Sequence, residues 1–230
     1  MSARSASPAE NPRTLVWDAP VRAFHWLLVL GFATAWLSAE SERWQLVHVT
    51  AGYTMAALVA FRVLWGRVGT RHARFSDFVR GPRAVLAYLK SLVRGRPEHH
   101  AGHNPAGALA IVGLLALTLL TVAAGWATYN EIGGKLFEEA HEALATLMLV
   151  IVVVHVLAVI VSSRLHRENL VASMIHGRKP VPSTEGIRGA RRGVAVVLLA
   201  TVLGFWWLQW QSAPADALSS ATQVEAGDDD

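Results

Sequence analysis

The chain has 230 residues, of which 53% are hydrophobic and only 17% charged, and it contains ten histidines and no cysteine. Soluble domains carry about 25% charged residues, so this composition excludes an ordinary water-soluble fold. The lack of cysteine excludes disulfides, thiolate metal sites, iron–sulfur clusters and the Cys-x-x-Cys-His attachment of a c-type haem. The composition therefore predicts an integral membrane protein.

Five apolar stretches approach the ~20 residues that a helix needs to cross ~30 Å of hydrocarbon. They cover residues 23–38, 44–65, 105–128, 140–161 and 193–210. We predict an all-α integral membrane protein, with a four-helix transmembrane bundle and a fifth, C-terminal transmembrane helix. The predicted parts are an N-terminal segment (1–22), the four-helix core (23–165), a basic linker (166–192), the fifth helix (193–211) and an acidic, disordered tail (212–230). A signal peptide is the alternative for the first stretch, but a signal peptide has no use for the histidine within it.

The positive charges predict how the chain crosses the membrane. Residues 66–104 contain eight Lys and Arg, residues 162–192 contain seven, and the first 22 residues contain three. Residues 39–43 and 129–139 contain one each, and the tail after Trp210 contains none. The positive-inside rule therefore places the N-terminus and both long loops in the cytoplasm and the C-terminus outside. The net charge of +4 then belongs to loops that flank the membrane, which argues against a nucleic-acid site.

The two long loops contain one helical pattern and most of the histidines. Apolar residues recur at helical spacing between residues 82 and 93, which predicts a short amphipathic helix on the inner membrane surface. A contact with a soluble partner is the alternative for this helix. The loop histidines are expected to be solvated, and the cluster at 99–103 would bind metal only adventitiously. They are His72, His99, His100, His103, His166 and His176.

Four histidines lie within or at the edge of the predicted spans: His25, His48, His141 and His155. His141 and His155 are 14 residues apart on one span, so they share a helix face and are separated by about 21 Å along it. His25 begins the first span at its cytoplasmic end, and His48 lies early in the second span at the outer end. Depth alone therefore pairs His48 with His141 and His25 with His155.

Two histidines from different helices at one depth, repeated at a second depth, favour two six-coordinate haems held between helices. Gly52, four residues after His48 and on its face, would let a macrocycle approach the backbone. The alternative is a histidine proton relay, as in a proton-coupled transporter. Against a transporter stand the near-absence of Asp and Glu within the spans, where Glu142 at the edge of the fourth is the one acid, and the lack of interrupted helices.

Arg62 and Arg22 are the candidate partners of a haem propionate. Arg62 follows His48 by 14 residues, so it lies on nearly the same face at the depth of the inner pair. A charge at that depth needs a counter-charge, which a propionate would supply. Snorkelling of Arg62 to the inner headgroups is the alternative. Arg22, three residues before His25, is a weaker candidate of the same kind.

The sequence resembles the bacterial di-haem cytochrome b561 family, which is grouped with the cytochrome b subunits of nickel–iron hydrogenases. The resemblance covers about residues 15–180. The residues that carry it are Trp17-Asp18-x-Pro20-x-Arg22-x-x-His25-Trp26, His48-x-x-x-Gly52-Tyr53, Phe61-Arg62-x-x-Trp65-Gly66, Ala73-Arg74-Phe75, Asn104-Pro105-x-Gly107, His141-x13-His155, Arg167-Glu168-Asn169 and Gly177-Arg178-Lys179.

The resemblance implies a four-helix core, two b-type haems and electron exchange with membrane quinone in a bacterial inner membrane. The expected function is electron transfer between the quinone pool and a redox partner of the respiratory chain. That partner would be a periplasmic c-type cytochrome, or a dehydrogenase or hydrogenase subunit. The alternative is a membrane anchor of a hydrogenase or other dehydrogenase, placed second because the loop at 39–43 is short. The chain would be an electron carrier, or a quinone oxidoreductase or a subunit of one.

The charge pattern makes a prediction about topology. A phosphatase fused to the C-terminus should be active, and a fluorescent protein fused there should be dark, because the acidic tail is expected outside the membrane. The opposite pattern would mean that the fifth apolar stretch does not cross the bilayer.

Overall fold

The computed structural model describes residues 13–95, 98 and 100–212. Five of its helices are long and apolar enough to cross a membrane, in agreement with the five predicted spans. They are α1 (Ala19–Ser38), α2 (Gln45–Val68), α5 (Pro105–Tyr129), α6 (Lys135–Leu165) and α8 (Arg192–Gln211). The largest difference from the prediction is α6, a helix of 31 residues that extends beyond the apolar stretch at both ends. The expected acidic tail lies almost wholly outside the described residues.

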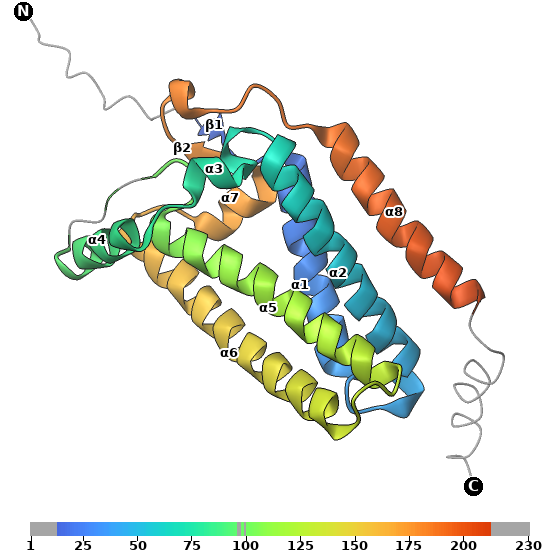
Figure 1. The fold of residues 1–230 in the computed structure, drawn as a ribbon. Helices are drawn as coiled ribbons and strands as arrows, with labels where there is room; N and C mark the ends of the chain where they lie inside the picture. Colours follow the sequence, from blue (N-terminus) through green and yellow to red (C-terminus); the bar gives the residue numbers. More distant parts are fainter. Residues whose placement is uncertain (1–12, 96–97, 99, 213–230) are drawn as a thin grey trace, which may run out of the picture.

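The long helices form two antiparallel hairpins (Figure 1). Helices α1 and α2 are joined by a short turn with a 3-10 helix at Glu42–Trp44, and α5 packs closely against α6. The two hairpins meet through α2 and α5, where buried Phe24, Leu58, Val59 and Leu115 pack together. Helix α8 packs on α1, and the indole Nε1 of Trp206 on α8 donates to Thr54 Oγ1 on α2 (2.9 Å).

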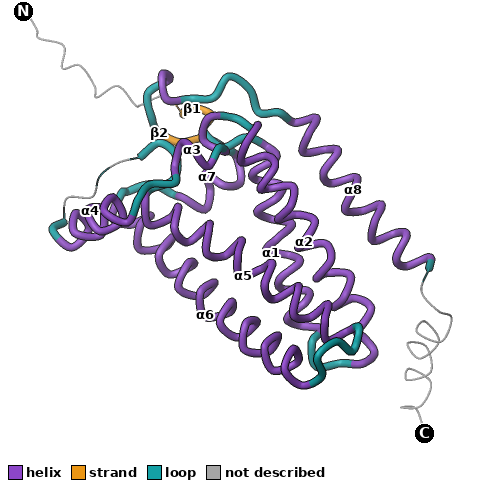
Figure 2. The backbone as a smooth tube through the Cα atoms, viewed as in Figure 1, coloured by secondary structure: helices purple, strands orange, loops and turns teal. Residues whose placement is uncertain are grey.

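The remaining elements gather at one end of the bundle, here called the loop end (Figure 2). The opposite end, with the short connections between α1 and α2 and between α5 and α6, is called the turn end. The elements of the loop end are β1 (Arg13–Leu15), η2 (Arg71–Ala73), α3 (Phe75–Phe78), α4 (Pro82–Val93), α7 (Leu170–His176), β2 (Arg178–Pro180) and η3 (Ser183–Glu185). Helix α4 confirms the predicted amphipathic helix.

A two-stranded sheet departs from the all-α prediction. Strands β1 and β2 are antiparallel, with Thr14 opposite Lys179. The pairing continues beyond the strands, because the backbone N–H groups of Val16 and Trp17 both donate to the carbonyl of Gly177. Each strand has only three residues, too few for a periodic pattern to be visible in the sequence. The sheet fastens the chain before α1 to the chain that leads into α8.

Asp18 joins three segments at the loop end. One carboxylate oxygen accepts from the backbone N–H of Val21 (2.9 Å) and so caps the start of α1. The other accepts from Trp65 Nε1 on α2 (3.0 Å) and from Thr70 Oγ1 in the following loop (2.7 Å). Asp18 is 1% exposed, so its carboxylate depends on these protein donors for its hydrogen bonds.

The Asp18 junction makes a prediction about stability. Asp18→Ala removes a helix cap, worth about 0.5–2 kcal/mol, and two partly buried hydrogen bonds, worth about 0.5–1.5 kcal/mol each. Thermal unfolding in detergent should therefore show a large loss for this variant. Asn169→Ala is the matched control, because Asn169 caps α7 through one exposed bond to the N–H of Ala172. Equal losses in the two variants would contradict the junction role of Asp18.

Candidate functional site

His48 on α2 and His141 on α6 face each other between the two hairpins near the turn end. Their ring centroids are 6.0 Å apart, and the ring planes cross at 80°. The two helices belong to different hairpins, so this proximity depends on how the hairpins pack. The pair is the one that depth predicts from the sequence.

Each of these two imidazoles is bonded to its own hairpin through Nδ1. His48 Nδ1 lies 2.8 Å from the carbonyl oxygen of Ala35 on α1, and His141 Nδ1 lies 2.9 Å from that of Thr121 on α5. A carbonyl can only accept, so in both rings Nδ1 carries the hydrogen and Nε2 is left with its lone pair. A metal-binding histidine needs this tautomer, and a backbone carbonyl is one of its usual partners.

A cavity of about 800 Å³ includes both rings. Its volume is within the roughly 300–1,000 Å³ of typical cofactor and ligand pockets. Its walls are mainly apolar and aromatic and include Phe32, Trp36, Met55, Trp126 and Met148. Gly52 also lines it, and a Cβ atom built on Gly52 would meet no atom within 4 Å. The chain therefore leaves open space beside Gly52, and its role in admitting a macrocycle stays a prediction.

Gly125 on α5 is a part of this site that the sequence reasoning missed. A Cβ atom there would lie 2.7 Å from Cε1 and 2.8 Å from Nδ1 of His141. Only glycine therefore lets the His141 ring lie against α5 and reach the carbonyl of Thr121. The sequence gives little signal for this role, because Gly125 lies 16 residues before His141 in a different helix.

The geometry of the pair fits two axial ligands of one iron. Imidazoles bound on opposite sides of a metal, with metal–nitrogen bonds of ~2.0–2.1 Å, have ring centres roughly 6 Å apart. The pair therefore has suitable spacing, suitable tautomers and an adjoining cavity. A porphyrin iron with two histidine ligands is the group that these features accommodate.

His25 on α1 and His155 on α6 are the second predicted pair, nearer the loop end. The two imidazoles are close enough for charge on one to act on the other. Within the described residues no ring contact joins them, and His25 instead packs edge-on against Trp26 at 5.2 Å. His25 Nδ1 is buried without a hydrogen-bond partner in the described chain. The second pair is thus brought together less tightly than the first.

The two arginines predicted beside a propionate differ in their surroundings. Arg62 is 2% exposed, its guanidinium lies 4.8 Å from the ring of Phe75, and its Nη1 has no hydrogen-bond partner among the described residues. Arg22 instead donates from Nε to the carbonyl of Asp18 (3.4 Å) and from Nη1 to that of Ile175. Arg22 therefore fastens α1 to α7, whereas Arg62 retains a free donor.

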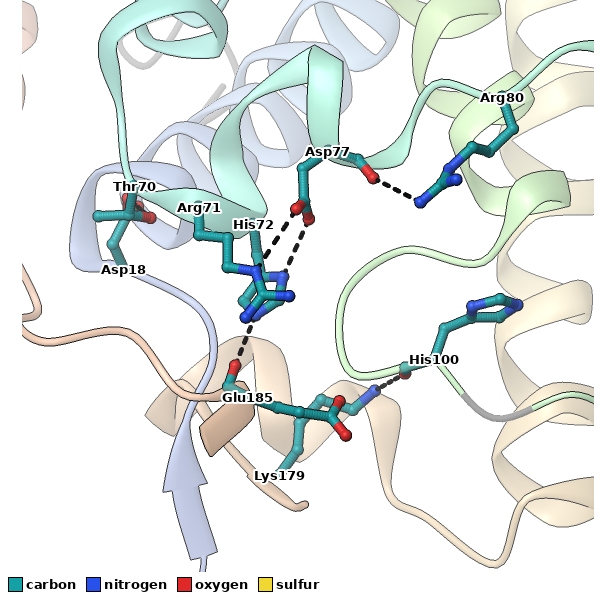
Figure 3. Close-up of polar contacts among 9 residues, drawn as sticks. All are labelled: Asp18, Thr70, Arg71, His72, Asp77, Arg80, His100, Lys179 and Glu185. Carbon is teal, nitrogen blue, oxygen red and sulfur yellow. Dashed lines mark hydrogen bonds and ion pairs between the residues drawn. The ribbon is translucent and has the colours of Figure 1, made fainter. Parts of the chain in front are cut away.

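The prediction that all the loop histidines are solvated is wrong for His72. The His72 ring lies between the Asp77 carboxylate (Nδ1, 3.1 Å) and the carbonyl of Glu185 (Nε2, 2.7 Å), as Figure 3 shows. His72 is 4% exposed, and Arg71 also pairs with Asp77 (3.6 Å). The side chain therefore links the loop after α2 to the linker before α8, a contact between segments more than 100 residues apart.

His103 is also not a solvated loop residue. Its ring packs against Trp17 (4.5 Å) and Phe78 (4.6 Å). Burial, followed by the positive charges of Arg62 and Lys179, lowers the pKa of His103 to about 3, so the ring is neutral at pH 7. His99, part of the cluster at 99–103, lies outside the described residues. Within the described residues, no group of three or more His, Cys, Asp or Glu side chains could hold a metal ion.

Lys179 is a second buried charge at the loop end. Its ammonium group pairs with Glu168 (3.3 Å) and donates to the carbonyl of His100 (3.3 Å; Figure 3). The lysine is 3% exposed, so these protein partners, not water, compensate its positive charge. The Arg167-Glu168-Asn169 and Gly177-Arg178-Lys179 motifs therefore meet in one ion pair.

Comparison with known proteins identifies relatives of this chain. The model of the prokaryotic cytochrome b561 family matches residues 16–177. A probable Ni/Fe-hydrogenase B-type cytochrome subunit of Rhizobium leguminosarum bv. viciae is 26% identical, over 74% of this chain and 90% of its own length. Those of Bradyrhizobium diazoefficiens (24% identical; 74% and 87%) and Escherichia coli K12 (27%; 50% and 60%) are also similar. No solved structure matches the chain significantly.

The family match covers most of the chain and includes all four membrane histidines. The five apolar helices agree with a chain that crosses the membrane several times. The chain belongs to the prokaryotic cytochrome b561 family, and it is a multi-pass, b-type haem protein of electron transport.

Proposed function

We propose that this protein is the membrane cytochrome b subunit of a hydrogenase, and that it passes electrons between the hydrogenase and the quinone pool of a bacterial inner membrane. The observation that carries the redox part of the proposal is the His48–His141 pair, with both Nε2 atoms available beside a cavity. The relatives, which are hydrogenase B-type cytochrome subunits by name, support the partner. Haem, when bound, supplies the one-electron chemistry.

Two haem sites are part of this proposal. His48 and His141 would hold one haem near the turn end, with Gly52 leaving room for the macrocycle. His25 and His155 would hold a second nearer the loop end. In this arrangement the four helices α1, α2, α5 and α6 form the haem-binding core, and α8 is an additional helix packed on α1.

The relatives change the order of the two functions considered from the sequence. A respiratory cytochrome with an unspecified partner was the first expectation, and a hydrogenase anchor was the alternative. The similarity to hydrogenase subunits extends over about three-quarters of this chain, despite the short turn between α1 and α2. We therefore favour the hydrogenase subunit. A periplasmic c-type cytochrome is the other partner that an electron carrier of this kind could serve.

The proposed function predicts both cofactor content and electron source. Purified protein should contain two non-covalent haems per chain in a pyridine haemochrome assay, because four histidines supply two pairs of axial ligands. In membranes that also contain the hydrogenase, hydrogen should reduce these haems, and added oxidised quinone should reoxidise them. Protein without haem would contradict the cytochrome assignment, whereas haem that hydrogen cannot reduce would contradict only the hydrogenase partner.

The turn-end site makes a prediction about single residues. His48→Ala and His141→Ala should each remove the same haem, and the double variant should lose little more, because ligands of one site act as a unit. Gly125→Ala should also weaken the binding of this haem, since the new methyl group would displace the His141 ring. Gly113→Ala in the same helix is the matched control, because a Cβ there meets no atom within 4 Å. Redox titration should resolve which component is lost, and equal effects of the two glycine changes would refute the packing role of Gly125.

A further inference from the structure

Three buried nitrogen atoms near the loop end lack hydrogen-bond partners among the described residues. They are His25 Nδ1, Arg62 Nη1 and His103 Nδ1. The charges of Arg62 and His25 both act on His103, so the three side chains occupy one region. Buried polar nitrogens are normally hydrogen-bonded, and an arginine nitrogen can only donate, so an acceptor is the group that this region lacks.

Aromatic rings fix the positions of Arg62 and His103. His103 packs against Trp17 and Phe78, and the Arg62 guanidinium lies 4.8 Å from Phe75 and 5.8 Å from Phe78. Phe78 therefore contacts both side chains. We call Trp17, Phe75, Phe78, Arg62 and His103 the loop-end cage.

Gly66 and Asn104 explain how the cage is assembled. A Cβ atom at Gly66 would lie 2.1 Å from Cε2 of Phe75, so only glycine lets Phe75 pack against α2 beneath Arg62. Asn104, next to His103, caps α5 by accepting from the N–H of Gly107 (2.7 Å). The cage is thus held by α2, α3, the segment that leads into α5 and the segment just before α1.

The acidic side chains around the cage are already committed to other donors. Asp18 is the acid whose charge acts on Arg62, but its two oxygens accept from Val21, Trp65 and Thr70. Glu168 pairs with Lys179. None of the ion pairs among the described residues includes Arg62, so the cage has a positive charge and unused donors. A carboxylate is the group that would satisfy both.

We propose that Arg62 and His103 together bind the carboxylate of a propionate of the loop-end haem, with His103 donating from Nδ1. This inference rests on the proposed function, which supplies that haem through His25 and His155. Because the charge of His25 acts on His103, the cage adjoins the predicted axial ligand. Charge-assisted hydrogen bonds from Arg62 would compensate the negative charge of the propionate, and neutral His103 would add one more donor. The aromatic rings of the cage would surround these bonds.

The test measures the midpoint potential of each haem by redox titration in His103→Leu and His103→Asn. Leucine removes the donor, so the propionate charge is less well compensated and the oxidised loop-end haem is favoured. We expect the reduction equilibrium of that haem to fall roughly tenfold, about 59 mV for a one-electron couple. Asparagine places an amide N–H near the position of Nδ1 and should restore most of the potential. The turn-end haem should not change in either variant.

Two controls separate the inference from a structural effect. His176→Leu alters an exposed histidine at the same end and should leave both potentials unchanged. Haem-depleted protein reconstituted with haem whose propionates are esterified should lose the difference between wild type and His103→Leu. Persistence of the difference with esterified haem would assign the anion to another source, such as a lipid headgroup, and would overturn the proposal.

The outcomes also distinguish this inference from the proposed function. A wild-type titration with fewer than two haem components would contradict the two-haem function itself. Two components in wild type, with the same potentials in His103→Leu, would overturn only the role of His103. If the leucine variant does not accumulate, His103→Met, which also lacks a side-chain N–H donor, provides the test. Its loop-end potential should fall as expected for leucine, and an unchanged potential would overturn the role of His103.

Discussion

In a bilayer a polar side-chain atom has no water to bond, so each imidazole nitrogen in the spans must find its partner in protein or ligand. His48 and His141 satisfy one nitrogen each, through carbonyls of Ala35 and Thr121 in their own hairpins. In each hairpin, therefore, a bond within the hairpin orients one imidazole through Nδ1, and the Nε2 atom of that imidazole is left for another partner. The two rings face each other where α2 and α6 come together, and both line the cavity between the hairpins.

The loop end is organised by different chemistry. Several of the motif residues there hold segments of the chain together. Asp18 joins the start of α1 to the end of α2 and the loop after it, Arg22 fastens α7 to α1, and Glu168 pairs with Lys179. Gly177, with a positive φ of 82°, ends α7 and lies against the carbonyl of Trp17, where any side chain would clash. These contacts give the loop end a fixed structure against which Arg62 and His103 are held.

The sequence predicted the features that depend on local periodicity and on depth. Helix count, the amphipathic α4 and the approach of His48 to His141 all follow from spacing along single helices. It could not predict the burial of His72, because its partners come from Asp77 and from Glu185, which is more than 100 residues away. The sequence also could not predict the role of Gly125, because Gly125 meets the His141 ring only where α5 packs against α6. What was missed are contacts between segments distant in the sequence, whose meeting points neither helical periodicity nor depth in the membrane fixes.

The two ends differ in charge in a way that bears on electron transfer. Glu40, Glu42 and Glu142 line the cavity at the turn end, and no Lys or Arg does so. At the loop end Arg62 and Lys179 are buried. Positive charge stabilises an electron added to a nearby iron and negative charge opposes it. Arg62 is buried, so its charge is poorly screened, whereas the three glutamates are exposed and their charges are screened more strongly. With haem bound at both ends, this asymmetry would favour reduction at the loop end.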